Sequence, residues 1–373
     1  MKTKSLLLVG LFFAHFVQAT VWTVSFDSRP AQFTNLQTAI DAAAAGDTLL
    51  VNGYGNSSNS NVTLLKPLVI IGEKWDEPAN QSDNNTTNPY PRTNVYGITL
   101  GRLNAYTAAS GTRIYGLYIS YLYLNPDFSG SQTGQVALDD VIVERCGIIS
   151  TSFNGYQYSP SYSNITFRNT LFTNNMNGLE RYNGRTFSNI LVTNCVFTNA
   201  YLSGSGSYGS LNGSVVVRNS IFIDRTSSAI FSGGIKGLIV ENCIFYRSEP
   251  TGCVDCTFNN NISYLCLDNT LPPASGNNVG SGNLENANPQ WTNYPALGDV
   301  QWSGTHDYSL QAGSAALGTG TNGTNIGLTG GNAPVNNLPI TPKTPEVIEV
   351  DIPVSSVPAG GTLQINLKAR TRD

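Results

Sequence analysis

The stretch Glu180-Arg181-Tyr182, followed by Arg185, brings reactive side chains close together in this 373-residue sequence. A carboxyl group can act as a general acid or base, and a guanidinium can stabilise negative charge that develops during a reaction. Glu180 is therefore the candidate acid/base, and Arg181 and Arg185 are the candidate charge stabilisers.

A second group of side chains suits binding rather than catalysis. It consists of four tyrosines from the same part of the chain, Tyr156, Tyr158, Tyr182 and Tyr208. A tyrosine ring has an apolar face and a hydroxyl, which match the apolar face and the hydroxyls of a sugar. We interpret these four as candidate carbohydrate-binding residues. The sequence leaves open the alternative that they decorate exposed turns rich in glycine and serine.

Other chemistry has less support in the sequence. There are two histidines, and a Ser-His-Asp set is conceivable only around His306, because His15 lies in an apolar leader. The motif Cys-Val-Asp-Cys at 253–256 has the spacing of half a zinc site, but no second pair and no nearby histidine accompany it. We predict no metal site and no cofactor.

A repeat predicts the elements that position these residues. Six segments of eight residues share one pattern, and their first residues lie 24, 24, 25, 25 and 23 positions apart. The segments are LYISYLYL (117–124), VIVERCGI (141–148), ITFRNTLF (165–172), ILVTNCVF (190–197), VVVRNSIF (215–222) and LIVENCIF (238–245). Such a repeat is typical of a solenoid, in which each coil buries its apolar side chains against the next.

Aligned as columns, the segments predict which side chains are buried. Positions one, three and eight hold large apolar residues, as the interior of stacked strands requires. Position five holds Asn169, Asn194, Asn219 and Asn242 in four of the segments. Asparagine tolerates the left-handed backbone and bonds to neighbouring backbone groups, so we expect a bend with a ladder of asparagines there.

The motifs FRNTLF, VTNCVF, VRNSIF and VENCIF resemble the coils of bacterial right-handed parallel β-helix proteins of the pectin-lyase-like superfamily. The stretches 33–54 and 66–73 resemble the entry to such helices, and 307–320 resembles a closing coil. The resemblance extends over residues 21–330. It implies a fold rather than an activity, since this architecture hosts lyases, hydrolases, epimerases, adhesins and non-catalytic proteins.

The resemblance also implies which catalytic groups to look for. A pectate-lyase-like enzyme holds Ca²⁺ with acidic residues and uses an arginine or lysine as base. Glu144 and Arg168 are neighbours across one coil step, as are Arg218 and Glu241, but we interpret both pairs as surface ion pairs. The double-aspartate motifs expected of polygalacturonase-type hydrolases are missing. Ca²⁺ is therefore expected only if the protein is a lyase.

The sequence predicts an all-β protein: a right-handed parallel β-helix solenoid with an N-terminal capping helix and a short C-terminal β-hairpin-like tail. The expected order is a signal peptide (1–19), the β-helix domain (20–330), a linker (331–345) and the tail (346–373).

The capping helix is expected at residues 34–44. Its apolar residues follow helical spacing, and Thr34 and Gln37 form a plausible capping box. Such a helix would cover the open end of the solenoid, where an exposed strand edge invites aggregation.

The compartment follows from the N-terminus. Lys2 and Lys4 precede an apolar run at 6–16 and a small-residue cleavage site at Ala19, as in a secretory signal. No later stretch is long and apolar enough to span a membrane. We therefore expect a secreted protein, extracellular or periplasmic.

Charge indicates the kind of partner. The net charge is −4 for the whole chain, and charged residues make up only 12% of it. Loss of the leader, with its two lysines, makes the charge still more negative. Nucleic acid is therefore excluded as a partner, since no basic stripe exists. A surface rich in Gly, Ser, Asn and Thr favours a polysaccharide or glycan instead.

Six cysteines occur in the chain. Cys146 and Cys195 share a column but lie two coils apart, about 9.6 Å at the strand spacing, which is too far for a disulfide. We predict that both are reduced and buried. For Cys243, Cys253, Cys256 and Cys266, one disulfide or free thiols remain open.

Two outward-facing columns are apolar, which a free solenoid surface would not be. Position two includes Ile142 and Leu191, and position seven includes Leu171 and Val196. We expect something to cover this patch. Residues 346–370 of the tail are one candidate, and a loop from the coils or a second chain in an oligomer are the others.

Taken together, these features favour a secreted β-helix protein that is a non-catalytic glycan-binding or cell-surface module. The alternative is a polysaccharide lyase or glycoside hydrolase that acts on an extracellular polysaccharide, with Glu180 as its acid/base.

Overall fold

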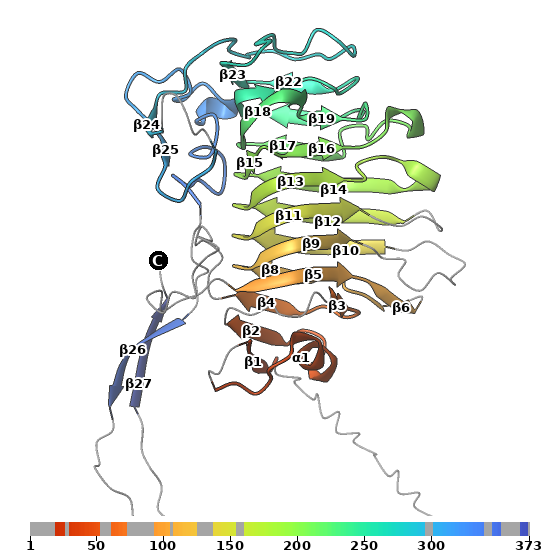
Figure 1. The fold of residues 1–373 in the computed structure, drawn as a ribbon, viewed down its shortest axis with the longest axis vertical. Helices are drawn as coiled ribbons and strands as arrows, with labels where there is room; N and C mark the ends of the chain where they lie inside the picture. Colours follow the sequence, from red (N-terminus) through yellow and green to blue (C-terminus); the bar gives the residue numbers. More distant parts are fainter. Residues whose placement is uncertain are drawn as a thin grey trace, which may run out of the picture.

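The computed structural model describes residues 19–26, 30–52, 61–72, 93–104, 107–124, 137–153, 160–294, 301–338, 345–351 and 366–371. They form a right-handed parallel β-helix, the all-β fold that the sequence predicts (Figure 1). Its coils stack into two long sheets, A with ten strands and B with eleven. The apolar core lies inside the coils. The predicted signal peptide lies almost wholly outside the described residues.

Sheet A contains, in spatial order, β1 (Val21–Ser25), β2 (Thr48–Asn52), β4 (Val69–Gly72), β8 (Arg113–Tyr115), β10 (Ala137–Glu144), β12 (Ser161–Arg168), β14 (Thr186–Thr193), β17 (Val215–Arg218), β20 (Ile239–Glu241) and β22 (Thr257–Asn259). Sheet B contains β3 (Asn61–Leu64), β5 (Asn94–Leu100), β9 (Tyr118–Leu124), β11 (Gly147–Phe153), β13 (Leu171–Asn177), β15 (Val196–Thr198), β18 (Ile221–Ala229), β21 (Ile244–Glu249) and β23 (Ile262–Tyr264), with β16 (Tyr201–Ser203) and β19 (Phe231–Ser232) beside them.

The remaining elements are short. Three antiparallel pairs join β6 (Arg102–Asn104) to β7 (Thr107–Ala108), β24 (Trp291–Asn293) to β25 (Asp307–Leu310), and β26 (Pro345–Asp351) to β27 (Asn366–Thr371). The helices are α1 (Leu36–Ala42) and the 3₁₀ turns η1 (Tyr182–Gly184), η2 (Gly206–Tyr208) and η3 (Thr321–Gly323).

The predicted alignment of the repeats is confirmed from the second segment on. Strands β10, β12, β14, β17 and β20 pair in the predicted register. Column eight forms a row of stacked rings, because Phe172, Phe197, Phe222 and Phe245 follow one another at centroid distances of 4.7, 4.6 and 5.1 Å. These rings are at most 1% exposed, so the column is part of the core.

The alignment predicted for the first segment is wrong. Tyr118 pairs with Gly147, and Ile114 pairs with Val143, so the segment equivalent to 141–148 begins at Thr112 rather than Leu117. The pattern is ambiguous here because both strands of a coil bury alternate residues. Apolar residues such as Leu117 therefore fit either strand.

The asparagines at position five adopt the left-handed conformation that their type predicts. Their φ angles are 50°, 51°, 48° and 53° at Asn169, Asn194, Asn219 and Asn242. Each side chain thus lies at the bend between a strand of sheet A and the next strand of sheet B.

Helix α1 is the predicted N-terminal cap, with one correction. The N-cap is Asn35, whose side-chain oxygen accepts from Thr38 N–H at 3.0 Å, and not Thr34. Gln37 instead ties the helix to β3, because it accepts from Thr63 N–H at 2.7 Å and donates to Thr63 O at 3.2 Å. An asparagine one residue later is an equally good cap, which explains the shift.

The outward-facing apolar column at position seven is covered by residues 301–338, which we call the covering segment. Leu171, Val196, Ile221 and Ile244 are at most 2% exposed. They share an apolar cluster with Tyr308, Ala316, Ile326, Leu328 and Leu338 of that segment. The prediction that the tail covers this column is therefore wrong. Association of copies through the outer apolar columns stays a prediction.

The covering segment also differs from two finer expectations. The stretch 307–320 does not add a closing coil, because β25 pairs antiparallel with β24 instead of joining the solenoid sheets. Residues 331–338, assigned to the linker, belong to the covering segment: Leu338 is 1% exposed in the apolar cluster with the coils, and Tyr308 N–H donates to Asn336 O at 2.8 Å.

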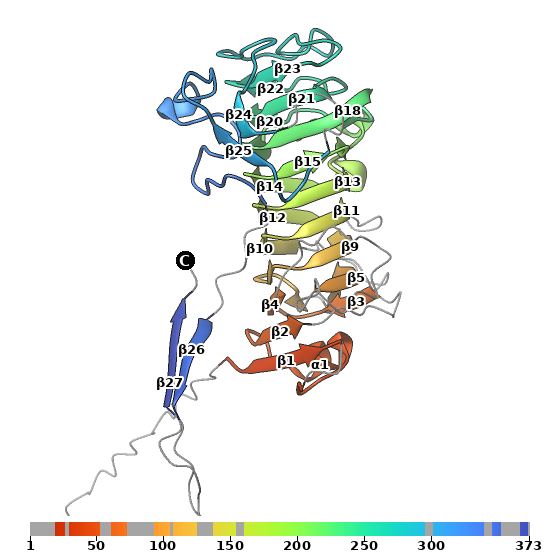
Figure 2. The same ribbon diagram turned by 60° about the vertical axis from the view of Figure 1, so that its left-hand side comes forward.

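The tail forms the predicted hairpin-like pair, β26 with β27. Figures 1 and 2 both place this pair at the level of the N-terminal coils, away from β13 to β23. Among the described residues, no helix is long and apolar enough to cross a membrane.

All six cysteines are described, and all are buried free thiols. Cys146 and Cys195 are 0% exposed, as predicted, and burial raises the pKa of each thiol to about 12. The coil after Cys243 is shorter than expected. Ile262 pairs with Ile244, so Asn261 rather than Cys266 follows Cys243 in the column.

Candidate carbohydrate-binding site

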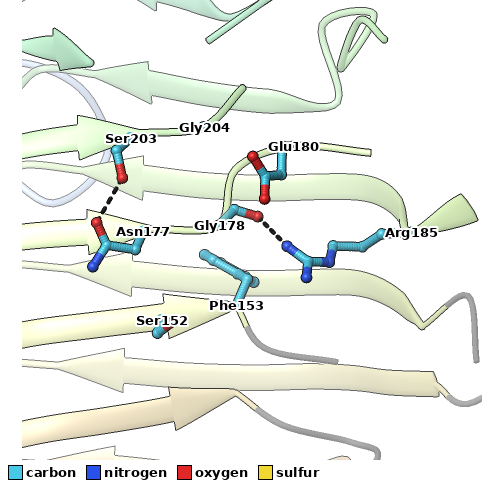
Figure 3. A pocket seen from close by; sticks show the side chains of 8 residues that line it. All are labelled: Ser152, Phe153, Asn177, Gly178, Glu180, Arg185, Ser203 and Gly204. Carbon is cyan, nitrogen blue, oxygen red and sulfur yellow. Dashed lines mark hydrogen bonds between the residues drawn. The ribbon is translucent and has the colours of Figure 1, made fainter. Parts of the chain in front are cut away.

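A pocket of about 250 Å³ lies where β11, β13 and β16 end (Figure 3). It is lined by residues at the ends of these strands and in the loops that follow them. They are Ser152, Phe153, Asn177, Gly178, Glu180, Arg185, Ser203 and Gly204. Stacking of successive coils thus brings together residues up to about 50 positions apart in the sequence.

Two glycines let the stacked loops approach closely enough to shape this pocket. A Cβ on Gly178 would lie 2.4 Å from Phe153 O, and a Cβ on Gly204 would lie 2.0 Å from Leu179 O. Both distances are too short for any side chain. Gly178 also has a φ of +79°, in the region that favours glycine.

Arg185 provides a buried cation at the pocket. It is 1% exposed, and its Nη1 donates to Gly178 O at 2.7 Å. Figure 3 shows its guanidinium reaching this carbonyl, with the carboxylate of Glu180 close to the same loop. This hydrogen bond fixes the position of the guanidinium, because a buried charge without a hydrogen-bond partner would cost free energy.

The pocket wall also carries neutral hydrogen-bonding groups. Ser203 Oγ donates to Asn177 Oδ1 at 2.6 Å, so the side chains at the ends of two neighbouring strands are held together (Figure 3). The predicted candidates include none of Ser152, Phe153, Asn177 or Ser203. The signal that could identify them is their place at the ends of strands next to Glu180 and Arg185 in the stack.

The loops 178–185 and 204–210 that border the pocket carry the two tyrosines that can be located. Tyr182 and Tyr208 meet edge to face, with ring centroids 4.7 Å apart. Tyr208 is 45% exposed. The pair therefore offers aromatic surface to solvent on the loops that border the pocket, but neither ring lines the pocket itself. Tyr156 and Tyr158 lie outside the described residues.

The structure separates the two candidate arginines. Arg181 is exposed and is not among the residues that line the pocket, whereas Arg185 lines it. Arg185 therefore shares the pocket with Glu180, whereas Arg181 does not line it. The pair could provide a single acid or base and a positive charge.

Two other acidic residues of the described coils, Glu144 and Asp139, have structural partners. Glu144 pairs with Arg168 across one coil step, as predicted, and also with Arg145 at 3.2 Å, but Glu144 is 7% exposed and therefore buried rather than on the surface. Asp139 accepts from Ser163 Oγ at 2.6 Å and from Asn164 Nδ2 at 2.8 Å, and these bonds lower the pKa of its carboxyl group. Within the described part of the chain, no group of three or more His, Cys, Asp or Glu residues could hold a metal ion.

Few known proteins resemble this chain in sequence. No family model matches it. The F-box protein SKIP5 of Arabidopsis thaliana is 42% identical over 45 residues, which are 12% of this chain and 16% of that protein. The chain thus matches about a sixth of that relative's length.

Among solved structures, two forms of the pectin methylesterase from Aspergillus niger are similar. The penultimately deglycosylated form is 12% identical with a TM-score of 0.26, and the deglycosylated form is 10% identical with a TM-score of 0.25. Each comparison covers 84% of this chain and 95% of the other.

Proposed function

We propose that this protein is a secreted β-helix module that binds a polysaccharide without cleaving it, at the pocket and the tyrosine pair beside it. The leader at 1–19 supports the secretion. The polar pocket wall supports the recognition of sugar hydroxyls, which hydrogen-bonding groups in fixed positions favour.

The observation that carries the proposal is the contact between Tyr182 and Tyr208. Their rings come from different coils, yet their centroids lie 4.7 Å apart, on two loops whose residues Glu180, Arg185 and Gly204 line the pocket. Amphipathic rings arranged in this way provide a rigid contact surface at low cost in conformational entropy.

The test is retention of the purified protein by a panel of immobilised polysaccharides. We expect at least one polysaccharide to retain it, and the double variant Tyr182→Ala, Tyr208→Ala to lose most of that retention. Ser207→Ala is the matched control, because Ser207 is exposed and lies next to Tyr208 in η2. This variant should bind normally. Unchanged retention of the double variant would overturn the site.

The alternative is a lyase or hydrolase. If the protein is such an enzyme, its active site would be this pocket, because Glu180 and Arg185 both line it. Glu180 would be the acid or base, and Arg185 would stabilise charge. Hydrolysis of a glycosidic bond generally uses a second carboxyl group. New reducing ends or unsaturated products that disappear in Glu180→Gln would establish this alternative against the binding module.

A further inference from the structure

A second pocket, of about 390 Å³, lies between the end of sheet B and the segment that carries β24. This volume is within the range of about 300–1,000 Å³ typical of small-molecule sites. Tyr246 of β21 and Tyr264 of β23 line one side, and Trp291 and Tyr294 line another. Four aromatic residues from three parts of the chain thus meet around one cavity.

The rings hold one another in place. Tyr246 lies 5.6 Å from Tyr264, 5.0 Å from Trp291 and 5.0 Å from Tyr294, measured between ring centroids. Trp291 is further fixed by Tyr308 at 5.0 Å. Tyr246 and Trp291 are 5% and 7% exposed, so the rigid part of the wall belongs to the core. Tyr264 is half-buried and forms part of the opening.

Amide side chains supply the polar part of the wall. Gln311 Nε2 donates to Trp291 O at 2.9 Å, and Asn288 Oδ1 accepts from Gln290 N–H at 2.9 Å. Gln290, Asn288 and Gln311 are all exposed at the pocket rim. An amide offers both a donor and acceptor, which suits hydroxyl groups.

The lining carries no charged side chain: it consists of Tyr, Trp, Leu, Asn and Gln only. Burial also raises the pKa of Tyr246 above its usual value, so its hydroxyl stays neutral at physiological pH. A ligand with an ionised carboxylate or phosphate would find no counter-charge in this lining. The first pocket differs in this respect, because Arg185 lines it.

We infer that this aromatic pocket is a separate binding site for a neutral sugar residue of an oligosaccharide. One apolar face of the sugar would stack on the rings, and its hydroxyls would bond to the amides of Gln290 and Gln311. The inference does not depend on the function proposed for the first pocket.

The test is fluorescence titration of the full chain with cellohexaose and mannohexaose, with hexagalacturonic acid as the charged counterpart. A neutral hexasaccharide should change the tryptophan emission saturably, and the acidic one should not. Tyr264→Ala should weaken binding about five- to tenfold, the range expected for one aromatic stacking contact. Tyr264→Phe should bind nearly as the unaltered protein.

Tyr182→Ala with Tyr208→Ala separates this site from the first pocket, since it should leave the fluorescence titration unchanged. Trp291 is a core residue, so its replacement is avoided. No saturable response to either neutral sugar, or stronger binding of hexagalacturonic acid, would overturn the inference.

Discussion

Single asparagine side chains join the coils to the covering segment. Asn194 is 0% exposed, and its Nδ2 donates to Leu328 O at 2.9 Å and to Gly330 O at 2.8 Å. Asn219 donates to Asn325 O at 3.2 Å in the same way. The bend asparagines therefore do more than turn the chain, because they also fasten the covering segment to the coils.

Asn194→Gly should destabilise the protein by about 1–3 kcal/mol, because glycine keeps the left-handed backbone but leaves two carbonyls of the covering segment without their donor. Urea unfolding measures this difference. Asn189→Gly is the matched control. Asn189 also has a positive φ, 53°, but it is exposed, and its side chain donates to the exposed Asn164 rather than to the covering segment. An equal loss in both variants would contradict the role given to Asn194.

Asp47 makes stability depend on pH. It accepts from Trp22 Nε1 at 2.8 Å, Thr20 N–H at 2.7 Å and Ala44 N–H at 2.8 Å, and the bond from Trp22 contributes most to lowering the pKa of its carboxyl group. The carboxylate therefore stabilises the fold above the unfolded-state pKa of about 3.9, and this contribution is lost as the pH falls through the lower folded-state value.

Thermal unfolding from pH 7 to pH 2.5 tests this expectation. The Tm of the unaltered protein should fall more steeply below pH 4 than that of Asp47→Asn, whose Tm should already be lower at pH 7. Parallel curves for the two proteins would show that Asp47 has an ordinary pKa.

At the scale of the elements, close approach between loops shapes the first pocket. Gly204→Ala would place a methyl group 2.0 Å from Leu179 O, so the loops after β13 and β16 would have to separate. We expect a loss of about 1–3 kcal/mol in stability, typical of overpacking, together with weaker polysaccharide retention. Gly304→Ala, whose nearest neighbour would be 3.9 Å away, should change neither property.

The sequence predicts the elements where the repeat is regular. The columns of apolar residues set the register of β10 to β20, since each coil buries equivalent positions against the next. The covering segment has no such repeat and consists of β25, which pairs antiparallel, and irregular turns. Its position on the coils therefore depends on contacts that form only in the folded chain. Of the residues that line the pocket, Glu180 and Arg185 are among the candidates named from the sequence, whereas Phe153 and Ser203 depend on how the loops stack.

At the scale of the whole molecule, the solenoid has a covered face and an open one. Column seven of sheet B lies beneath the covering segment, whereas Ile142, Leu191, Val216 and Ile239 in column two of sheet A are half-buried. Association of copies through an outer apolar column remains a prediction, for which column two is the more accessible.

Truncation distinguishes the cover from the tail. Deletion of 339–373 should leave the stability of the solenoid nearly unchanged, because column seven keeps its cover. Deletion of 301–373 should expose Leu171, Val196, Ile221 and Ile244 and cause association, measured by light scattering after gel filtration. A large loss of stability in the shorter deletion would assign the covering role to the tail after all.

The most direct test of the proposed site is to map where the bound polysaccharide contacts the chain. Hydrogen–deuterium exchange should be compared with and without the polysaccharide that retains the protein best. We predict slower exchange in the loops 178–185 and 204–210, which border the first pocket, and no such change on sheet A. Protection confined to the strands of sheet A, with both loops unaffected, would contradict the site.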